Sequence, residues 1–139
     1  MRLKEHPSAR ESLAPLLAPL LATGRAVLDN ATDSFAQVAG SQGVVTLNSS
    51  MGLQAFFYDK PVITLGRALF ALPGLVTACQ DQDQTNAAFS GLQGFDQGLR
   101  DGFMSWLDAV YYPRFSEAGT DRAAFAAKCD QSRLSRDKR

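Results

Sequence analysis

Short apolar runs alternate with helical patterns along the first half of the chain. Three of these runs predict buried strands, at 26–28, 43–47 and 62–65, and residues 2–5 are predicted to be the end of a further strand. The run at 43–47 is the clearest, because it is uninterrupted and rich in valine, as a central parallel strand is. This β-α-β-α-β-α-β alternation predicts a parallel sheet with right-handed crossovers.

The first predicted helix follows the strand at 2–5. Ser8 and Glu11 have the spacing of a capping box, and Gly24 predicts the end of the helix. Pro15 and Pro19 disturb it: one fits the first turn, and the other predicts a kink. The leucines at helical spacing are Leu13, Leu16, Leu17, Leu20 and Leu21.

Later segments carry signals of uneven strength. Thr32 or Asp33 can cap a second helix that runs to about Gly40, and a third helix is predicted at about 50–58. Residues 66–93 have weaker patterns, apart from a turn at Pro73-Gly74. The remaining segments are predicted as a polar loop at 80–86, helices at 95–110 and 121–131, and a flexible basic tail at 132–139.

Composition suits a single domain with a real core, since 45% of the 139 residues are hydrophobic. Lys plus Arg and Asp plus Glu each total 14, so the net charge is zero. A balanced charge argues against bulk nucleic acid as a partner, although it allows a local basic cleft. No apolar run approaches the roughly 20 residues that span a membrane. Cys79 and Cys129 fit no metal-binding spacing and are predicted to be free thiols in a reducing cytoplasm.

A polar motif, Asn48-Ser49-Ser50, opens the predicted third helix. A helix N-terminus has unpaired N–H groups and about half a positive charge. Between the strand at 43–47 and Asp59 there is no acidic residue that could offset this positive charge. The motif could therefore bind an anion as well as cap the helix. Gly52 is unfavourable inside a helix and fits a close approach by a ligand or another backbone segment. The alternative is a capped helix with a packing glycine, and the spacing leaves both open.

A second motif, Lys4-Glu5-His6-Pro7, follows the first predicted strand. His6 is the only histidine of the chain, and Pro7 keeps the backbone extended before the helix. The carboxyl ends of parallel strands share one edge, where ligands bind in open α/β folds. His6 could therefore reach the same phosphate as Ser49 and Ser50. A purely structural histidine is the alternative.

The sequence offers no nucleophile–base pair, and it lacks GxSxG, Walker A and GxGxxG motifs. Asp81-Gln82-Asp83 matches a DxD pattern that binds divalent metals in some glycosyltransferases. Two acids at this spacing arise easily in a polar loop, so we assign no metal site. The late aromatic residues are predicted to pack in the core rather than to stack on nucleic acid bases: Trp106, Tyr111 and Tyr112.

Three motifs occur in an order and spacing that resemble those of a known family. They are Lys4-Glu5-His6-Pro7, the segment 46–55 (TLNSSMGLQA) and the segment 60–68 (KPVITLGRA), and Pro73-Gly74-Leu75 fits the same pattern. The motifs resemble the bacterial capsule polysaccharide biosynthesis and export family, which takes part in polysaccharide transport. That family includes cytoplasmic transferases of Kdo (3-deoxy-D-manno-octulosonic acid). The resemblance covers about residues 2–78.

The resemblance implies a fold and a ligand. Members have a two-domain GT-B architecture and use CMP-Kdo as donor. Residues 1–131 would then form an α/β, Rossmann-like nucleotide-sugar-binding domain. It would be an open parallel sheet with helices on both faces, equivalent to the C-terminal half of a GT-B glycosyltransferase. By similarity to sialyltransferase motifs that hold the CMP phosphate, the phosphate-binding residues would be His6, Asn48, Ser49 and Ser50, supported by Lys4, Pro7, Gly52 and Gly66. A CMP leaving group carries one phosphate, so neither a metal nor another cofactor is implied.

The resemblance also implies a missing half. In a GT-B enzyme the general base and the acceptor site belong to the N-terminal domain. The domain at 1–131 would therefore be truncated at its N-terminus, and catalysis by this chain alone is not expected. Expected partners are CMP-Kdo or a related CMP-sugar, and the missing domain or other capsule assembly proteins. The expected location is the cytoplasm, peripheral at the inner membrane. The alternatives are a non-catalytic nucleotide or phosphosugar-binding scaffold module and a nonfunctional gene remnant.

Overall fold

The computed structural model describes residues 1–112, 115–116 and 119–120. The predicted helix at 121–131 and the predicted basic tail at 132–139 lie outside these residues. Within them the predicted class is confirmed: the fold is α/β, with parallel strands in an open, Rossmann-like arrangement and no closed barrel.

The first unit is a β-α-β crossover. Strands β1 (Arg2–Leu3) and β2 (Val27–Leu28) pair in parallel, and helix α1 (Ala14–Ala22) connects them. The unit is thinly covered, because no residue of α1 is buried. Of its two prolines, Pro15 lies in the first turn and Pro19 lies inside the helix.

A second, three-stranded parallel sheet holds the core. Its strands are β3 (Val44–Thr46), β4 (Val62–Thr64) and β5 (Thr77–Ala78), in that order. All three residues of β4 are buried, as expected for a central strand paired on both sides. Helix α2 (Ser34–Ala39) precedes β3, and α3 (Met51–Phe56) crosses from β3 to β4. The predicted alternation is confirmed, and β5 was not predicted.

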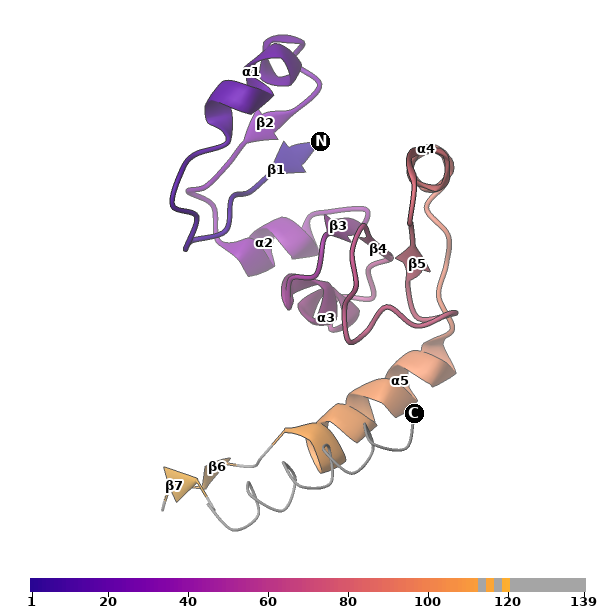
Figure 1. Cartoon of the computed structure of the whole chain (residues 1–139). Helices are drawn as coiled ribbons and strands as arrows, with labels where there is room; N and C mark the ends of the chain where they lie inside the picture. Colours follow the sequence, from indigo (N-terminus) through magenta and orange to yellow (C-terminus); the bar gives the residue numbers. More distant parts are fainter. Residues whose placement is uncertain (113–114, 117–118, 121–139) are drawn as a thin grey trace.

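Three further elements follow β5: α4 (Gln82–Ser90), α5 (Gln97–Trp106) and a π-helical turn, η1 (Leu107–Tyr111), that continues α5. A short antiparallel pair, β6 (Phe115–Ser116) and β7 (Gly119–Thr120), comes last. Figure 1 shows α3 between the three-stranded sheet and α5. The core agrees, because Ala55 and Phe56 of α3 join one buried cluster with Val62 of β4 and Phe103 of α5.

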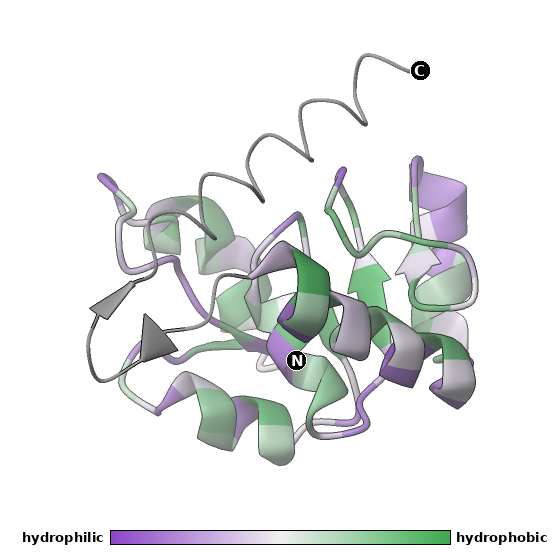
Figure 2. Ribbon diagram, turned by 90° about the horizontal axis from the view of Figure 1, so that it is seen from below, coloured by the Kyte–Doolittle hydropathy of each residue, from purple (hydrophilic) through white to green (hydrophobic). Residues whose placement is uncertain are grey.

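Two local predictions were wrong. Residues 80–86 are not a loop, because Asp81 caps α4: its carboxylate accepts a hydrogen bond from the Gln84 N–H at 2.8 Å. Figure 2 shows how hydrophilic this helix is beside the apolar strand β4. The predicted capping box at Ser8 and Glu11 does not form either, since α1 begins only at Ala14. By contrast, Asp33 caps α2 as predicted.

Candidate functional site

The Lys4–Pro7 motif closes the carboxyl end of the first sheet. The Lys4 ammonium donates to the carbonyls of Asn30, at 3.2 Å, and of Thr32, at 2.5 Å. The Glu5 backbone N–H donates to Asn30 Oδ1 at 3.0 Å, and Asn30 Nδ2 donates to Glu5 Oε2 at 2.7 Å. Lys4 and Glu5 therefore tie the segment after β1 to the turn after β2. The contacts of Lys4 are thus with the backbone of this turn, and its support of a phosphate site stays a prediction.

Glu5 also organises the start of α1. Its Oε1 accepts hydrogen bonds from the Ser12 hydroxyl, at 2.9 Å, and from the Leu13 backbone N–H, at 2.5 Å. The Leu13 N–H, then the amide of Asn30 and the Ser12 hydroxyl, hold the pKa of the Glu5 carboxyl below its usual value of 4.5. This contact between distant residues takes the place of the capping box that local spacing predicted.

Replacing Glu5 with glutamine should lower the melting temperature at pH 7, because the amide cannot accept all three bonds. A carboxyl whose folded pKa is depressed stabilises the fold above its unfolded pKa. That stabilisation is lost as the pH falls through the lower folded value. The gap between parent and Glu5→Gln should therefore shrink below about pH 4.5. Thermal unfolding followed by circular dichroism at pH 7 and at acid pH measures it.

Glu11→Gln is the matched control, since Glu11 lines the same pocket and makes no side-chain hydrogen bond within the described residues. It should melt with the parent at both pH values. Equal melting temperatures of Glu5→Gln and Glu11→Gln would contradict the proposal that Glu5 stabilises the start of α1.

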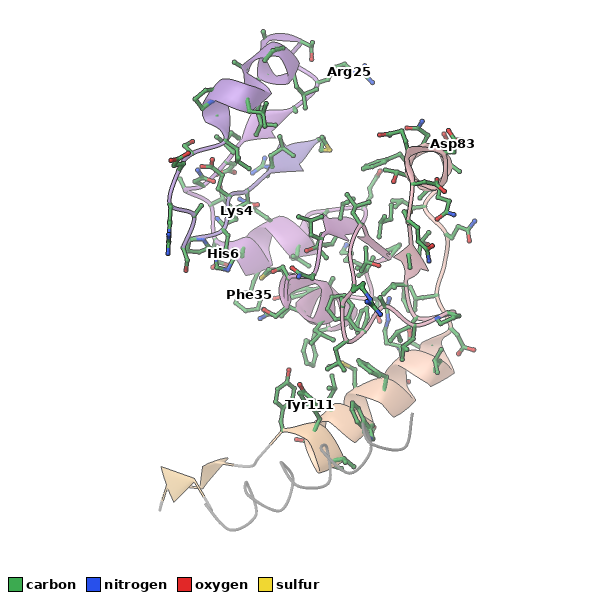
Figure 3. The ribbon with its side chains drawn as sticks, in the orientation of Figure 1. Lys4, His6, Arg25, Phe35, Asp83 and Tyr111 are labelled. Carbon is green, nitrogen blue, oxygen red and sulfur yellow. The ribbon has the colours of Figure 1, made fainter. Side chains whose placement is uncertain are left out.

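His6 directly follows Glu5 in the chain, and its side chain is exposed. Its Nδ1 accepts a hydrogen bond from the Ser8 backbone N–H at 3.1 Å, and its carbonyl accepts one from Ala9 N–H at 2.9 Å. Because Nδ1 accepts, the neutral ring carries its proton on Nε2, which is thereby a hydrogen-bond donor. Lys4, His6 and Pro7 line one pocket of about 300 Å³ with Asn30. Figure 3 shows Lys4 and His6 on the segment after β1.

The serines of the second motif have different roles. The Ser49 N–H donates to Thr46 Oγ1 at 3.0 Å, and the Ser49 hydroxyl accepts from the Met51 N–H at 3.2 Å. Ser49 thus caps the first turn of α3. Ser50 occupies the N-cap position, but its hydroxyl makes no capping bond. Asn48 is exposed. Within the described residues, the Ser50 hydroxyl is the member of the serine pair that is left for a ligand.

The two glycines predicted to support the site are explained by packing. A Cβ at Gly52 would lie 2.5 Å from Cζ of Phe70, and one at Gly66 would lie 2.9 Å from the Leu47 carbonyl oxygen. Phe70 is a core residue, 2% exposed. Of the two explanations left open for Gly52, the structure therefore provides the packing one.

His6 and Ser50 both follow the carboxyl ends of parallel strands, but they line separate pockets. Their strands belong to different hydrogen-bonded sheets, β1–β2 and β3–β4–β5. Ser50 opens on a larger cavity of about 470 Å³ between α2, α3 and the α5–η1 helix. Sequence reasoning missed Phe35 and Gln54, which line this cavity, because it forms only when three helices pack together.

The described residues were also compared with the requirements of a metal site and of a membrane span. Within that part of the chain, no group of three or more His, Cys, Asp or Glu side chains could hold a metal ion. Asp81 of the DxD pattern serves as the cap of α4. Within residues 1–112, 115–116 and 119–120, the structure contains no helix that is long and apolar enough to cross a membrane.

Comparison with known proteins places these features in a family. The profile described as capsule polysaccharide biosynthesis protein matches residues 4–95, which include both motifs. Protein FixF of Sinorhizobium fredii (strain NBRC 101917 / NGR234) is 30% identical over 131 residues, a match that covers 91% of this chain. The chain spans 32%, about a third, of the length of that curated relative. No solved structure matches the chain.

Proposed function

This chain belongs to the capsule polysaccharide biosynthesis protein family, and from that premise we propose that it binds the CMP-Kdo donor of a Kdo glycosyltransferase with GT-B architecture. The observation that carries the proposal is a pair of hydrogen-bond donors at strand ends. The His6 ring has its proton on Nε2, because Nδ1 accepts from the backbone. The Ser50 hydroxyl stands at the start of α3 without a capping bond.

The chemistry of a CMP leaving group fits these donors. Negative charge builds on the phosphate as the bond from sugar to oxygen breaks, and donors already aimed at that charge lower the barrier. Because His6 and Ser50 line separate pockets, the donor phosphate would have to lie between them, at the carboxyl ends of β1 and β3, where ligands bind in open α/β folds. Ser49 would act by holding the first turn of α3, and Lys4 by holding the turn that presents His6.

The acceptor site and the general base would come from another domain or another capsule assembly protein. His6 is the only histidine, and its Nδ1 is already engaged by the Ser8 N–H. A base paired with a nucleophile is not found among the described residues. Donor binding without sugar transfer is therefore the activity proposed for this chain, at the cytoplasmic side of the inner membrane.

The purified chain should bind CMP more tightly than cytidine and should not transfer Kdo. A hydrogen bond to a charged phosphate contributes about 1.5–3 kcal/mol, so two of them should separate the ligands by at least about a hundredfold. Isothermal calorimetry with both ligands measures this, beside a transfer assay with CMP-Kdo. Equal affinities for CMP and cytidine would contradict the proposed phosphate site. Robust Kdo transfer by the chain alone would contradict the need for a base from another domain.

A further inference from the structure

The parallel strands form two sheets with no hydrogen-bonded pairing between them. Within the described residues, β1 pairs with β2 alone, and β3 pairs with β4 alone. Helix α2 still ties the sheets together, because Gln37 donates to the Asp29 carbonyl, just after β2, at 2.9 Å. Toward the second sheet, Val38 of α2 joins the core cluster that contains Val62 of β4. In Figure 1, β1 lies between β2 and β3, so the unpaired edges of β1 and β3 are the inner edges of the two sheets.

The strand order leaves one position between these inner edges. Doubly wound sheets commonly have the order 3-2-1-4-5-6 or the order 2-1-3-4-5. In the second order β1 and β3 would be neighbours and would pair, which they do not within the described part of the chain. In the first order β1 to β5 occupy positions 2 to 6, in agreement with the pairings of β1 with β2 and of β4 with β3 and β5. Position 1, between β1 and β3, is then open to one further strand.

The inner edge of β1 presents backbone groups to this position. In a parallel strand the N–H and C=O of one residue point to one side, and those of the next residue point to the other. The carbonyls of Met1 and Leu3 accept hydrogen bonds from the β2 segment, at 3.0 Å and 2.9 Å. The N–H and C=O of Arg2, between them, are therefore directed to the inner edge. The Arg2 guanidinium is paired with Asp29 at 2.6 Å, so the charge of Arg2 is compensated.

The inner edge of β3 has the same backbone pattern and an apolar side chain that is only partly covered. The Val44 N–H donates to the Pro61 carbonyl at 2.9 Å, and the Thr46 carbonyl accepts from the Leu65 N–H at 2.9 Å. The backbone of Val45, between them, is directed away from β4. The Val45 side chain is 37% exposed, whereas all three residues of β4 are buried. A strand placed beside β3 would pair with the backbone of Val45 and cover its side chain.

A neutral, apolar strand is the occupant that these edges favour. Free sheet edges bind extended peptides through main-chain hydrogen bonds, and strands inside parallel sheets are rich in valine and isoleucine. The match to FixF leaves about two-thirds of that relative outside the matched region, so polypeptide beyond this region is the source that we expect for the strand. We propose that an extended segment of another protein chain, rich in valine and isoleucine, binds between β1 and β3 as a parallel strand and joins the two sheets into one. The inference does not depend on CMP binding.

The test titrates the full chain with the peptide acetyl-KVIVVK-amide and follows hydrogen exchange by NMR. At saturation the Val45 amide should exchange at least about tenfold more slowly, because it then donates within a sheet. The Leu28 amide should be unchanged, since the neighbouring N–H groups of Val27 and Asp29 bond to β1 and Leu28 lies on the outer edge of β2. The same peptide N-methylated at the valine after isoleucine lacks one donor and should bind about three- to tenfold more weakly. Both comparisons use the unmodified chain, so they do not depend on the folding of a variant.

A matched pair of variants locates the binding edge. Val45→Lys places a charge on the inner edge, as natural edge strands do to prevent pairing, and should weaken peptide binding by at least about tenfold. Val27→Lys makes the same change on β2, where the side chain is 51% exposed, and should keep the affinity of the parent. Melting curves check that both variants are folded.

Three results would overturn the proposed strand site: no saturable binding of the peptide to the parent, slower exchange at Leu28 instead of Val45, or unchanged binding in Val45→Lys. Sedimentation of the parent and of Val45→Lys tests the source of the strand. A dimeric parent that Val45→Lys makes monomeric would assign the site to a second copy of this chain and overturn the separate partner. A parent that is monomeric without the peptide and binds it at the inner edge would support the proposal.

Discussion

Replacing Arg100 with alanine should lower the free energy of unfolding by about 3 kcal/mol, a loss typical of truncating a large buried side chain. Arg100 is 1% exposed. Its guanidinium lies between two rings, 3.0 Å from the centroid of Phe95 and 4.3 Å from that of Phe56. Nη2 donates to the Lys60 carbonyl at 3.1 Å. Alanine would leave a void between the rings and an unpaired carbonyl.

A matched variant separates packing from charge. Burial lowers the pKa of Arg100 to about 10, partly opposed by Asp59 and Asp101, so the group stays charged at neutral pH. Nε and Nη1 are buried without partners within the described residues, and a buried charge with unmet donors is costly. Arg100→Met keeps most of the volume and removes that cost, so it should lose less than half as much stability as Arg100→Ala. Urea unfolding at pH 7 measures both.

An alanine variant within 1 kcal/mol of the parent would contradict this role for Arg100, because truncating a well-packed core side chain costs more. The contact also bears on the site. Arg100 joins α5 to α3 through Phe56 and to the segment before β4 through Lys60. The same α5 carries Met104 into the wall of the cavity beside Ser50. Loss of Arg100 should therefore weaken CMP binding as well.

His6→Ala and Ser50→Ala should each weaken CMP binding by roughly tenfold or more, since each removes a donor to a charged phosphate. Neither change should unfold the chain. The His6 ring is exposed, and Ser50 makes no capping bond. Ser49→Ala is the informative comparison, because the Ser49 hydroxyl accepts from Met51 N–H. That variant should lose about 1 kcal/mol of stability, with a smaller effect on affinity than Ser50→Ala. Calorimetry and thermal melts, run on the same samples, separate the two serines.

Local signals in the sequence were enough for most of the fold. Uninterrupted runs such as 43–47 predicted parallel strands, and Asp33 predicted the start of α2, because those signals lie within a few residues of the structure they specify. The predictions that were wrong concern elements that depend on contacts between residues far apart in the sequence. Helix α1 begins at the point where the Glu5 carboxylate accepts from the Leu13 N–H. Helix α4 has no apolar stripe in its sequence; it is stabilised by its Asp81 cap and by packing of Ala88 against Ile63 of β4.

The site was predictable to a lesser degree. The two motifs and their positions after strands followed from sequence, and so did the packing alternative for Gly52. That Ser49 and Ser50 have separate roles depends on Thr46 Oγ1 and on backbone geometry, which no spacing rule contains. Burial of the cation Arg100 between Phe56 and Phe95 runs against the usual exposure of arginine.

The central claim is that this chain recognises the phosphate of a CMP-sugar through His6 and Ser50. A double comparison tests it most directly: CMP and cytidine are titrated by calorimetry into the parent and into the His6→Ala/Ser50→Ala double variant. We predict that the parent prefers CMP by at least about a hundredfold, and that this preference falls to about threefold or less in the double variant. Cytidine affinity should be the same in both proteins. A folded double variant that retains the full preference for CMP would contradict the claim and leave both motifs with purely structural roles.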